Sequence, residues 1–538
     1  MTWQFCFGFF YEEGTDCYFK LLSNGIYTGS HDYYFNLGIL RYHSICYSLL
    51  YSKWPKTEWY DVFTIFHLTL LAVALILILK LIWERSLWLL SLVVVGLFLE
   101  QFLVVQVTRL AFLITGLAML ALATSNFESR KQSTSLLLLF LVLYGGLIRI
   151  DSSILAIVVV LPAIIGFLLR FHSKKKLLPV ITALLSVVLL AGSYTVPLIV
   201  VDKKYDTIRP YTYTLWDYRG PTVDSANLSP FQRGIISVFE RKFFDDSQVI
   251  NEAFFLDAGI NGMDKRLDGI LNQLENGLRY LPDFFTFGYK DLLNYSWSIA
   301  LLIGFMVTTS LRVVPNKRAY FLLVSLWPIC IILILAVFFK LESRIVSPII
   351  LLGVAQCVVL FKNHIKGTTR VTDIIGVLPI IPILYGSVSV KNEVQARSEL
   401  FQKELSDIYA STESPLFVTM NVLEQAHSAL TFQAHAPMPS LYSIHNAHVS
   451  MYPSYQKKMF ELTNGKDFKS YLGYLSNCDG CLVLSSRYRI ETLQMFADLC
   501  YTDSQYFFQE VCSKKFAEVD ALNDLGYGLF SVRIKTHE

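Results

Sequence analysis

Long uninterrupted apolar blocks constrain this chain more than any other feature of its sequence. The block at residues 60–83 (YDVFTIFHLTLLAVALILILKLIW) is long enough to cross the hydrocarbon core of a bilayer, which takes about 20 residues. Charged residues make up only 17% of the chain, whereas soluble domains carry about a quarter. The sequence therefore predicts an α-helical polytopic membrane protein. The predicted spans are residues 60–83, 86–107, 110–124, 134–150, 153–170, 177–201, 292–312, 319–339, 345–361 and 371–390.

The charges of the short loops predict the orientation, because basic residues gather in cytoplasmic loops. Five loops agree on one side, which we assign to the cytoplasm. They carry Lys80 and Arg85; Arg130 and Lys131; Arg170 and Lys174 to Lys176; Arg312, Lys317 and Arg318; and Lys362, Lys366 and Arg370. The opposite side receives residues 11–59, the long loop 202–291 and everything after Lys391. We therefore expect a multi-pass protein of the inner or plasma membrane.

This topology divides the chain into five parts. Residues 1–59 would hold a truncated first span, the first outer loop and an interfacial helix near 37–50. Residues 60–201 and 292–390 would form the two halves of the transmembrane bundle, separated by the extracytoplasmic loop 202–291. Residues 391–538 would form a soluble extracytoplasmic domain. Its short apolar runs at 416–420 and 480–484, the alternating run at 527–534, and helical patterns at 395–409 and 488–500 predict an α/β fold.

Four cysteines lie in this predicted outer domain: Cys478, Cys481, Cys500 and Cys512. Their even number and the oxidising compartment predict that at least two of them are disulfide-bonded. The pair Cys478 and Cys481 forms a CxxC motif, but no thioredoxin-like strand–helix pattern precedes it. A structural disulfide or a plain thiol pair is therefore favoured over redox catalysis.

Four histidines of the same domain raise the question of a metal site. They are His427, His435, His445 and His448. The last two could bind a metal together if they shared a helical turn, but Pro437, Pro439 and Pro453 make a helix there unfavourable. We expect no metal site and no cofactor, although a divalent metal stays an open alternative. The net charge of +3, without a basic run interleaved with aromatic residues, argues against nucleic acid as a partner.

Three arginines end predicted spans on the outer side, where basic residues are uncommon. They are Arg109, Arg149 and Arg344. A guanidinium group grips phosphate with two parallel hydrogen bonds, so these residues are candidates for an anion site at the outer leaflet. The open alternative is ordinary ion pairing with the nearby acids Glu100, Asp151 and Glu342.

The first outer loop carries a pattern that resembles a known family. Residues 14–29 (GTDCYFKLLSNGIYTG) are followed by Leu37 and Gly38 and by residues 54–60 (WPKTEWY). This arrangement resembles bacterial multi-span proteins related to the glycosyltransferase-C superfamily, in which an acid pair precedes "ilnGxytG" and the next span begins with "WY". Residues 144–151 (YGGLIRID) and 340–348 (KLESRIVSP) are similar to two further motifs of that group. Asp16 matches the second acid of the pair, and Thr15 replaces the first.

The resemblance implies a glycosyltransferase-C-like bundle and a catalytic acid in the first outer loop. Asp16 would be the base, and Arg149 and Arg344, with Arg109, would bind the donor phosphate. The implied donor is a polyprenyl-phosphate-linked sugar, and the implied acceptor is a glycan or envelope component. The family has a complete span before this loop, whereas here only ten residues precede Tyr11. Two alternatives stay open: a non-catalytic envelope-assembly protein, and a transporter or flippase of lipid-linked glycans.

Overall fold

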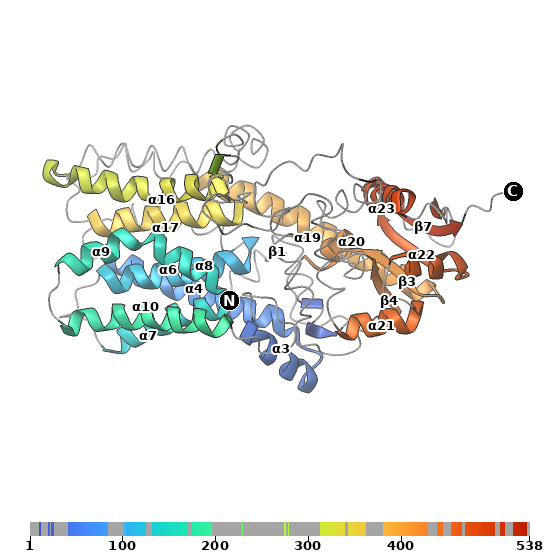
Figure 1. Ribbon diagram of the computed structural model, residues 1–538, viewed down its shortest axis with the longest axis horizontal. Helices are drawn as coiled ribbons and strands as arrows, with labels where there is room; N and C mark the ends of the chain where they lie inside the picture. Colours follow the sequence, from blue (N-terminus) through green and yellow to red (C-terminus); the bar gives the residue numbers. More distant parts are fainter. Residues whose placement is uncertain are drawn as a thin grey trace.

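The structure is a computed structural model, and its described residues form an apolar helical bundle joined to an α/β domain (Figure 1). It describes residues 10–11, 20–21, 23–25, 41–83, 102, 104–124, 132–170, 174–195, 229, 274–275, 278, 313–338, 343–361, 380–428, 438, 440–444, 453–464, 468–500, 506–511 and 520–534. The bundle helices are α4 (Trp59–Trp83), α6 (Val107–Thr124), α7 (Gln132–Ile148), α8 (Ile150–Val159), α9 (Leu161–Arg170), α10 (Lys174–Thr195), α16 (Arg318–Phe338) and α17 (Ser343–Phe361), with the short turn η2 (Pro315–Lys317) before α16.

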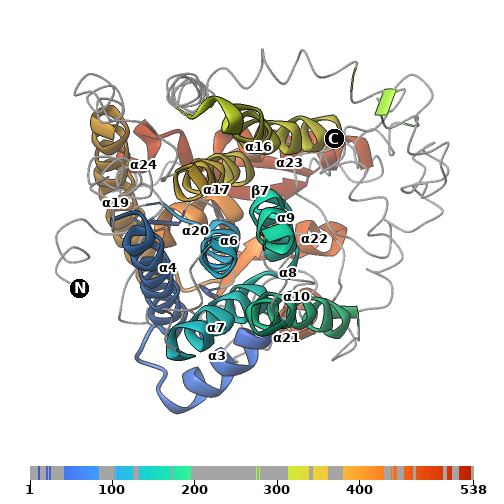
Figure 2. The ribbon, with the colours of Figure 1, turned by 90° about the vertical axis from the view of Figure 1, so that its left-hand side faces the viewer.

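Helix α6 lies at the centre of the bundle. Every one of its residues except the last is buried, and Figure 2 shows α4, α7, α8 and α17 around it. A helix that is apolar all round is buried, either against protein or in lipid. Gly145 of α7 lets the two helices approach closely, because a side chain there would meet Thr115 and the backbone of Ala111. In this bundle, neighbouring helices cover α6.

Three described helices are long and apolar enough to cross a membrane: Trp59–Leu81, Val107–Thr124 and Arg318–Val337. Shorter apolar helices cover Gln132–Ile148, Leu178–Ser193 and Ile345–Phe361. Large apolar side chains such as Ile76, Leu169, Leu189 and Leu323 are exposed on the bundle. Exposed apolar surface of this kind suits contact with lipid. The predicted spans 86–107 and 292–312, and the first part of 371–390, lie almost wholly outside the described residues.

The segment predicted as a single span at residues 153–170 forms two helices, which together are long and apolar enough for one bent span. Helix α8 ends at Val159, α9 begins at Leu161, and the two axes are bent by 55°. Pro162 is the second residue of α9. Proline has no N–H for the helix ladder and is therefore favoured in a first turn, which explains a new helix start at this point.

Helix α3 (Arg41–Lys53) packs across the bundle at the end that faces the α/β domain, here named the domain end. A helix is thus present at 41–53, in the region where the interfacial helix near 37–50 was predicted, and residues 37–40 lie outside the described residues. Aromatic rings hold it: His43 and Tyr47 of α3 contact Phe63 of α4 edge-on, and His43 Nε2 lies 3.0 Å from the Tyr144 hydroxyl of α7. Burial lowers the pKa of His43 to about 4, so this ring is neutral at physiological pH.

Helix α19 (Ile380–Ser411) joins the bundle to the domain without a break. Its 32 residues run through the predicted boundary at 390/391 and include the predicted helix at 395–409. Its distal part is buried in the domain, where Phe401 and Leu405 belong to the domain core. One continuous helix therefore runs from the bundle into the core of the domain.

The domain is built on a five-stranded mixed sheet with the order β4-β3-β5-β7-β6. The strands are β3 (Leu416–Thr419), β4 (Leu441–Ile444), β5 (Leu482–Ser486), β6 (Tyr506–Glu510) and β7 (Tyr527–Ile534). Strand β3 is parallel to β4 and β5, and β7 is antiparallel to β5 and β6. The helices are α20 (Met420–His427), α21 (Pro453–Thr463), α22 (Phe468–Asn477), α23 (Arg487–Cys500) and α24 (Asp520–Asp524). The predicted α/β fold is confirmed.

Candidate functional site

The structure fixes both described flanks of the first outer loop at the domain end of the bundle. Upstream, β1 (Phe10–Tyr11) pairs in parallel with β2 (Val104–Val105), which directly precedes α6. Downstream, Lys20, Leu21, Ser23 and Asn24 are helical, and Gly25 turns the chain with a φ of 76° that favours glycine. Asp16, together with Glu12, Glu13 and Thr15, lies outside the described residues.

A buried ion pair attaches the downstream flank to α4. The Nζ of Lys20 donates a hydrogen bond to Oδ2 of Asp61 at 2.8 Å, and both side chains are fully buried. Asp61 lies in the first turn of α4, a helix long enough to span a membrane. An acid at such a position is costly unless a cation compensates it, so the pair is required for both residues to be buried.

A second carboxylate, Glu58, lies three residues before Asp61 and is also fully buried. The Tyr51 hydroxyl of α3 donates to Glu58 Oε1, and Asn24 Nδ2 donates to Glu58 Oε2 at 3.0 Å. The backbone N–H of Tyr60 donates to the Tyr51 hydroxyl at 3.0 Å. Lys20, Asn24, Tyr51, Glu58 and Asp61 are named the Glu58 cluster below. The cluster joins the loop, α3 and α4 in one network.

The environment of Glu58 shifts its titration. Burial raises the pKa of Glu58 to about 7. The charge of Lys20 and the two donated hydrogen bonds favour the ionised form, whereas the charge of Asp61 opposes it. Burial also raises the pKa of Tyr51, so its hydroxyl keeps the proton that it donates. Glu58 can therefore exchange a proton near neutral pH, but it is shielded from solvent.

Arg149 lies at the domain end of α7, between that helix and α8. Its Nε lies 2.9 Å from Oδ1 of Asp151, and its Nη1 donates to Thr108 Oγ1 of α6 at 2.6 Å. Gln106 Nε2 donates to the same Thr108 oxygen at 2.8 Å, and Gln106 Oε1 accepts from the backbone N–H of Arg109 at 2.8 Å. Ion pairing with Asp151, the ordinary alternative for this arginine, is thus realised. The Arg149 side chain still keeps 21% of its surface exposed.

The backbone N–H of Arg109 joins the polar network of the Arg149 side chain, next to the β1–β2 pair. The Arg109 side chain is almost wholly buried in the bundle, only 2% exposed. Arg344 belongs to the first turn of α17, and its side chain lies outside the description, as do Glu100 and Glu342. The backbone of Arg109 therefore lies near the side chain of Arg149, and of these two side chains Arg149 is the one that reaches the surface.

The Glu58 cluster was not predicted as a site from the sequence. Its members occur in the two segments, 14–29 and 54–60, that carry the family resemblance, together with Asp61 and Tyr51 beside them. One signal was present: Glu58 and Asp61 are three residues apart at the start of a span, a spacing that places two acids on one helix face. Their partners cannot be read from spacing, because Lys20 is 41 residues from Asp61.

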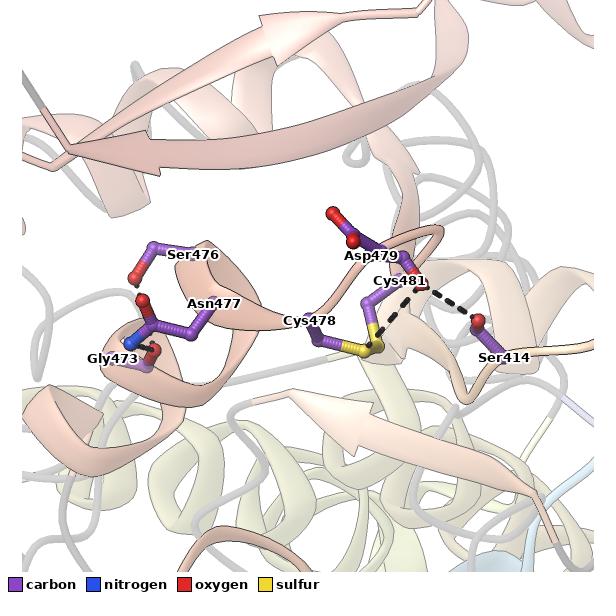
Figure 3. Close-up of a disulfide and its surroundings, with 7 residues drawn as sticks. All are labelled: Ser414, Gly473, Ser476, Asn477, Cys478, Asp479 and Cys481. Carbon is purple, nitrogen blue, oxygen red and sulfur yellow. Dashed lines mark hydrogen bonds between the residues drawn. A yellow bond between two sulfur atoms is a disulfide. The ribbon is translucent and has the colours of Figure 1, made fainter.

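In the C-terminal domain, Cys478 and Cys481 form a disulfide with their Cα atoms 5.5 Å apart, which confirms the prediction of at least one bonded pair. Figure 3 shows it at the turn between α22 and β5. Gly480, with a φ of 82°, makes the turn, and Ser414 Oγ donates to the Asp479 carbonyl at 2.9 Å. The bond thus closes the entry to a core strand, as a structural disulfide does.

Of the four histidines, His427 alone belongs to the described residues, where it is buried at the end of α20. His435, His445 and His448 lie outside them. Within the described residues, no group of three His, Cys, Asp or Glu side chains is arranged to hold a metal ion.

No protein-family model matches the chain, and no curated protein matches it either. What the fold defines is therefore a class: a mostly helical protein with at least three apolar helices that can cross a membrane and a small C-terminal sheet.

Proposed function

We propose that this protein is a membrane glycosyltransferase that transfers a sugar from a polyprenyl-phosphate donor to an extracytoplasmic glycan or envelope acceptor. One observation carries the proposal. The chain on both sides of Asp16 is anchored at the domain end of the bundle, through β1–β2 on one side and Lys20–Asp61 on the other. A catalytic acid in a loop needs such support, because misplacement by about 1 Å can cost 10²-fold in rate.

The proposed fold is glycosyltransferase-C-like, in the inner or plasma membrane, with the C-terminal domain outside the cytoplasm. In the reaction, Asp16 takes the proton of an acceptor hydroxyl, whose oxygen attacks the anomeric carbon of the donor sugar. A new glycosidic C–O bond forms, the bond to the phosphate oxygen breaks, and polyprenyl phosphate leaves with the electron pair. Arg149, Arg344 and Arg109 would stabilise the charge on that phosphate. Arg149 supports this role because its side chain keeps 21% of its surface exposed.

The Glu58 cluster would position the loop. Its residues are buried and hydrogen-bonded to one another, so they do not meet a substrate directly. Lys20 and Asn24 follow Asp16 by four and eight residues. Their attachment to α4 would therefore limit the positions that the proposed base can adopt.

The proposal is tested with Asp16→Asn, which keeps the shape of the side chain but cannot accept the proton. Transfer should fall by about 10²–10⁴-fold, while expression and membrane insertion stay as in the wild type. Glu12→Gln and Glu13→Gln are matched controls in the same loop and should keep activity. The glycans of cells carrying each variant would be compared by mass spectrometry.

Two results would overturn this assignment. If Asp16→Asn keeps full transfer while a Glu12 or Glu13 variant loses it, the catalytic acid is another residue. If none of the three variants changes the glycan, the non-catalytic assembly protein becomes the better proposal. The presence of Thr15 at the first acid position favours that second candidate.

A further inference from the structure

The sheet of the C-terminal domain has a switch point between β3 and β5. The chain leaves β3 for β4 on one side and then crosses to β5 on the other side of β3, and all three strands are parallel. In open α/β sheets, ligands bind outside the carboxyl ends of the strands, where successive connections part in opposite directions. In this domain that place lies between the ends of β3 and β5.

Polar side chains gather at that place. They are Thr419 at the end of β3, Asn421 in the first turn of α20, Ser485 and Ser486 at the end of β5, and Tyr527 at the start of β7. These five residues are named the polar ledge. Asn421 Nδ2 donates to Ser486 Oγ at 2.9 Å and to the Tyr527 hydroxyl at 3.3 Å. Thr419 Oγ1 lies 2.6 Å from Asn421 Oδ1 and 2.8 Å from Ser485 Oγ. The five side chains of the ledge therefore belong to one hydrogen-bond network.

The outer part of the ledge keeps unused hydrogen-bonding capacity. Asn421, Ser486 and Tyr527 are only partly buried, whereas Thr419 and Ser485 are fully buried. Ser486 Oγ accepts from Asn421 and from the backbone N–H of Arg489, and the Tyr527 oxygen accepts from Asn421. Within the part of the chain that the structure describes, neither hydroxyl proton has an acceptor. Burial raises the pKa of Tyr527, so its proton is retained at physiological pH. Two donors are thus ready for the oxygens of a ligand.

The arginines around the ledge are matched by an equal number of glutamates. Arg397 is paired with Glu393 at 2.6 Å, and Arg487 with Glu510 at 2.8 Å. Arg489 and Glu424, of opposite sign, both act on Tyr527. An anion or a cation would find no excess of opposite charge here. Hydroxyl and amide groups that both donate and accept match the hydroxyl groups of an uncharged sugar.

The ledge faces the bundle. Tyr409 lies near the far end of α19, and its hydroxyl accepts a hydrogen bond at 3.2 Å from the backbone N–H of Ser440, just before β4. Phe401, eight residues nearer the bundle, packs edge-on against Tyr527 with the ring centroids 4.7 Å apart. The carboxyl ends of β3 and β5 therefore point back along α19 toward the bundle, and α20 lies on that side in Figure 1. Leu21 of the first outer loop belongs to the same apolar core as Phe401.

We propose that the polar ledge binds an uncharged oligosaccharide and presents it to the domain end of the bundle. That this oligosaccharide is the sugar acceptor rests on the proposed function, whereas the binding site itself does not. The side chains that contact the ligand would be Asn421, Ser486 and Tyr527.

The test uses the full-length protein in detergent, applied to a printed array of neutral hexose and N-acetylhexosamine oligosaccharides beside anionic glycans. The wild type should bind neutral oligosaccharides. The double variant Ser486→Ala/Tyr527→Phe removes two hydroxyl groups and keeps the ring against Phe401, so it should fold and bind roughly tenfold more weakly or worse. The matched control Ser414→Ala/Asn477→Ala removes two polar groups at the opposite end of the sheet, near the disulfide in Figure 3, and should bind as the wild type does.

Three outcomes would overturn the proposal: no binding to any neutral glycan, binding to anionic glycans alone, or equal binding by the wild type and the ledge variant with an unchanged unfolding temperature. If the ledge variant unfolds, glycan binding by the single variant Tyr527→Phe decides between the outcomes, because this substitution removes only one hydroxyl group. The proposed transfer reaction is tested separately. If Asp16→Asn leaves both transfer and glycan binding intact, the proposed reaction is wrong and the proposed binding site stands.

Discussion

Lys20 and Asp61 form a fully buried ion pair of 2.8 Å between the first outer loop and α4, although 41 residues separate them in the chain. The lysine comes from a short helical turn and the acid from the first turn of an apolar helix. Because neither charge reaches solvent, each residue depends on the other. The stability of the loop and the stability of the bundle are therefore linked.

Breaking this pair should be strongly destabilising. We expect Lys20→Met to lower the free energy of unfolding by about 3–5 kcal/mol, because it leaves the Asp61 carboxylate buried without its cation. The double variant Lys20→Met/Asp61→Leu should recover most of that loss. Thermal unfolding in detergent measures both. Lys457→Met is the control, because Lys457 and its partner Glu461, 3.8 Å away, are both exposed side chains of α21, and it should change stability by less than about 1 kcal/mol. Equal effects of Lys20→Met and Lys457→Met would show that the first pair is not buried.

Glu58 should make stability depend on pH. Its folded pKa of about 7 lies above its ordinary value of 4.5, so the folded protein binds a proton in this window that the unfolded chain has lost. Stability should therefore fall as the pH rises from 4.5 to 7, by on the order of 3 kcal/mol relative to Glu58→Gln. Unfolding of both proteins in detergent between pH 4.5 and 8 measures the difference. Glu491→Gln, at an exposed position of α23, should parallel the wild type. Parallel curves for the wild type and Glu58→Gln would contradict the shift.

The bond between Cys478 and Cys481 should be present in the mature protein. Maleimide labelling after denaturation without reductant should leave these two thiols unmodified, and labelling after reduction should modify both. The variant Cys478→Ser/Cys481→Ser should lose only about 2 kcal/mol, because the bond closes a very short loop. Free labelling of both cysteines without reductant would contradict the bond.

The orientation of the chain is tested by fusion proteins. Alkaline phosphatase is active only outside the cytoplasm, so its fusion after Glu538 should be active, and a fluorescent reporter of cytoplasmic folding at the same position should be dark. A second pair of fusions after Lys131, in a predicted cytoplasmic loop, should give the opposite pattern. Reversal of both pairs would invert the predicted topology.

Strong local patterns in the sequence predicted the corresponding elements well. Strand β7 has the predicted bounds 527–534, since apolar and polar residues alternate along it. Strands β4 and β6 were missed. Both are edge strands, so each is covered on fewer sides and carries a weaker apolar pattern than the central strands β3 and β5.

The candidate site was predictable only in its location. The residues of the first outer loop and of 54–60 pointed to one region, and the structure joins them through Asn24 and Glu58. The partners could not be foreseen, because the contact spans 34 residues and depends on how α3 and α4 pack. The bend after Val159 was missed for another reason: the apolar character continues across it, and Pro162 alone marks the break.

Because α19 is uninterrupted, it fixes the distance between the bundle and the C-terminal domain. A helix of 32 residues is about 48 Å long, and its rise per residue hardly varies. A flexible linker would let the C-terminal domain move relative to the bundle, whereas this helix joins the two by one rigid element. Inserting or deleting a few residues in it would rotate the domain by about 100° for each residue as well as shift its height. The separation between bundle and sheet is therefore not adjustable by small changes of length, and any molecule that bridges them must match it.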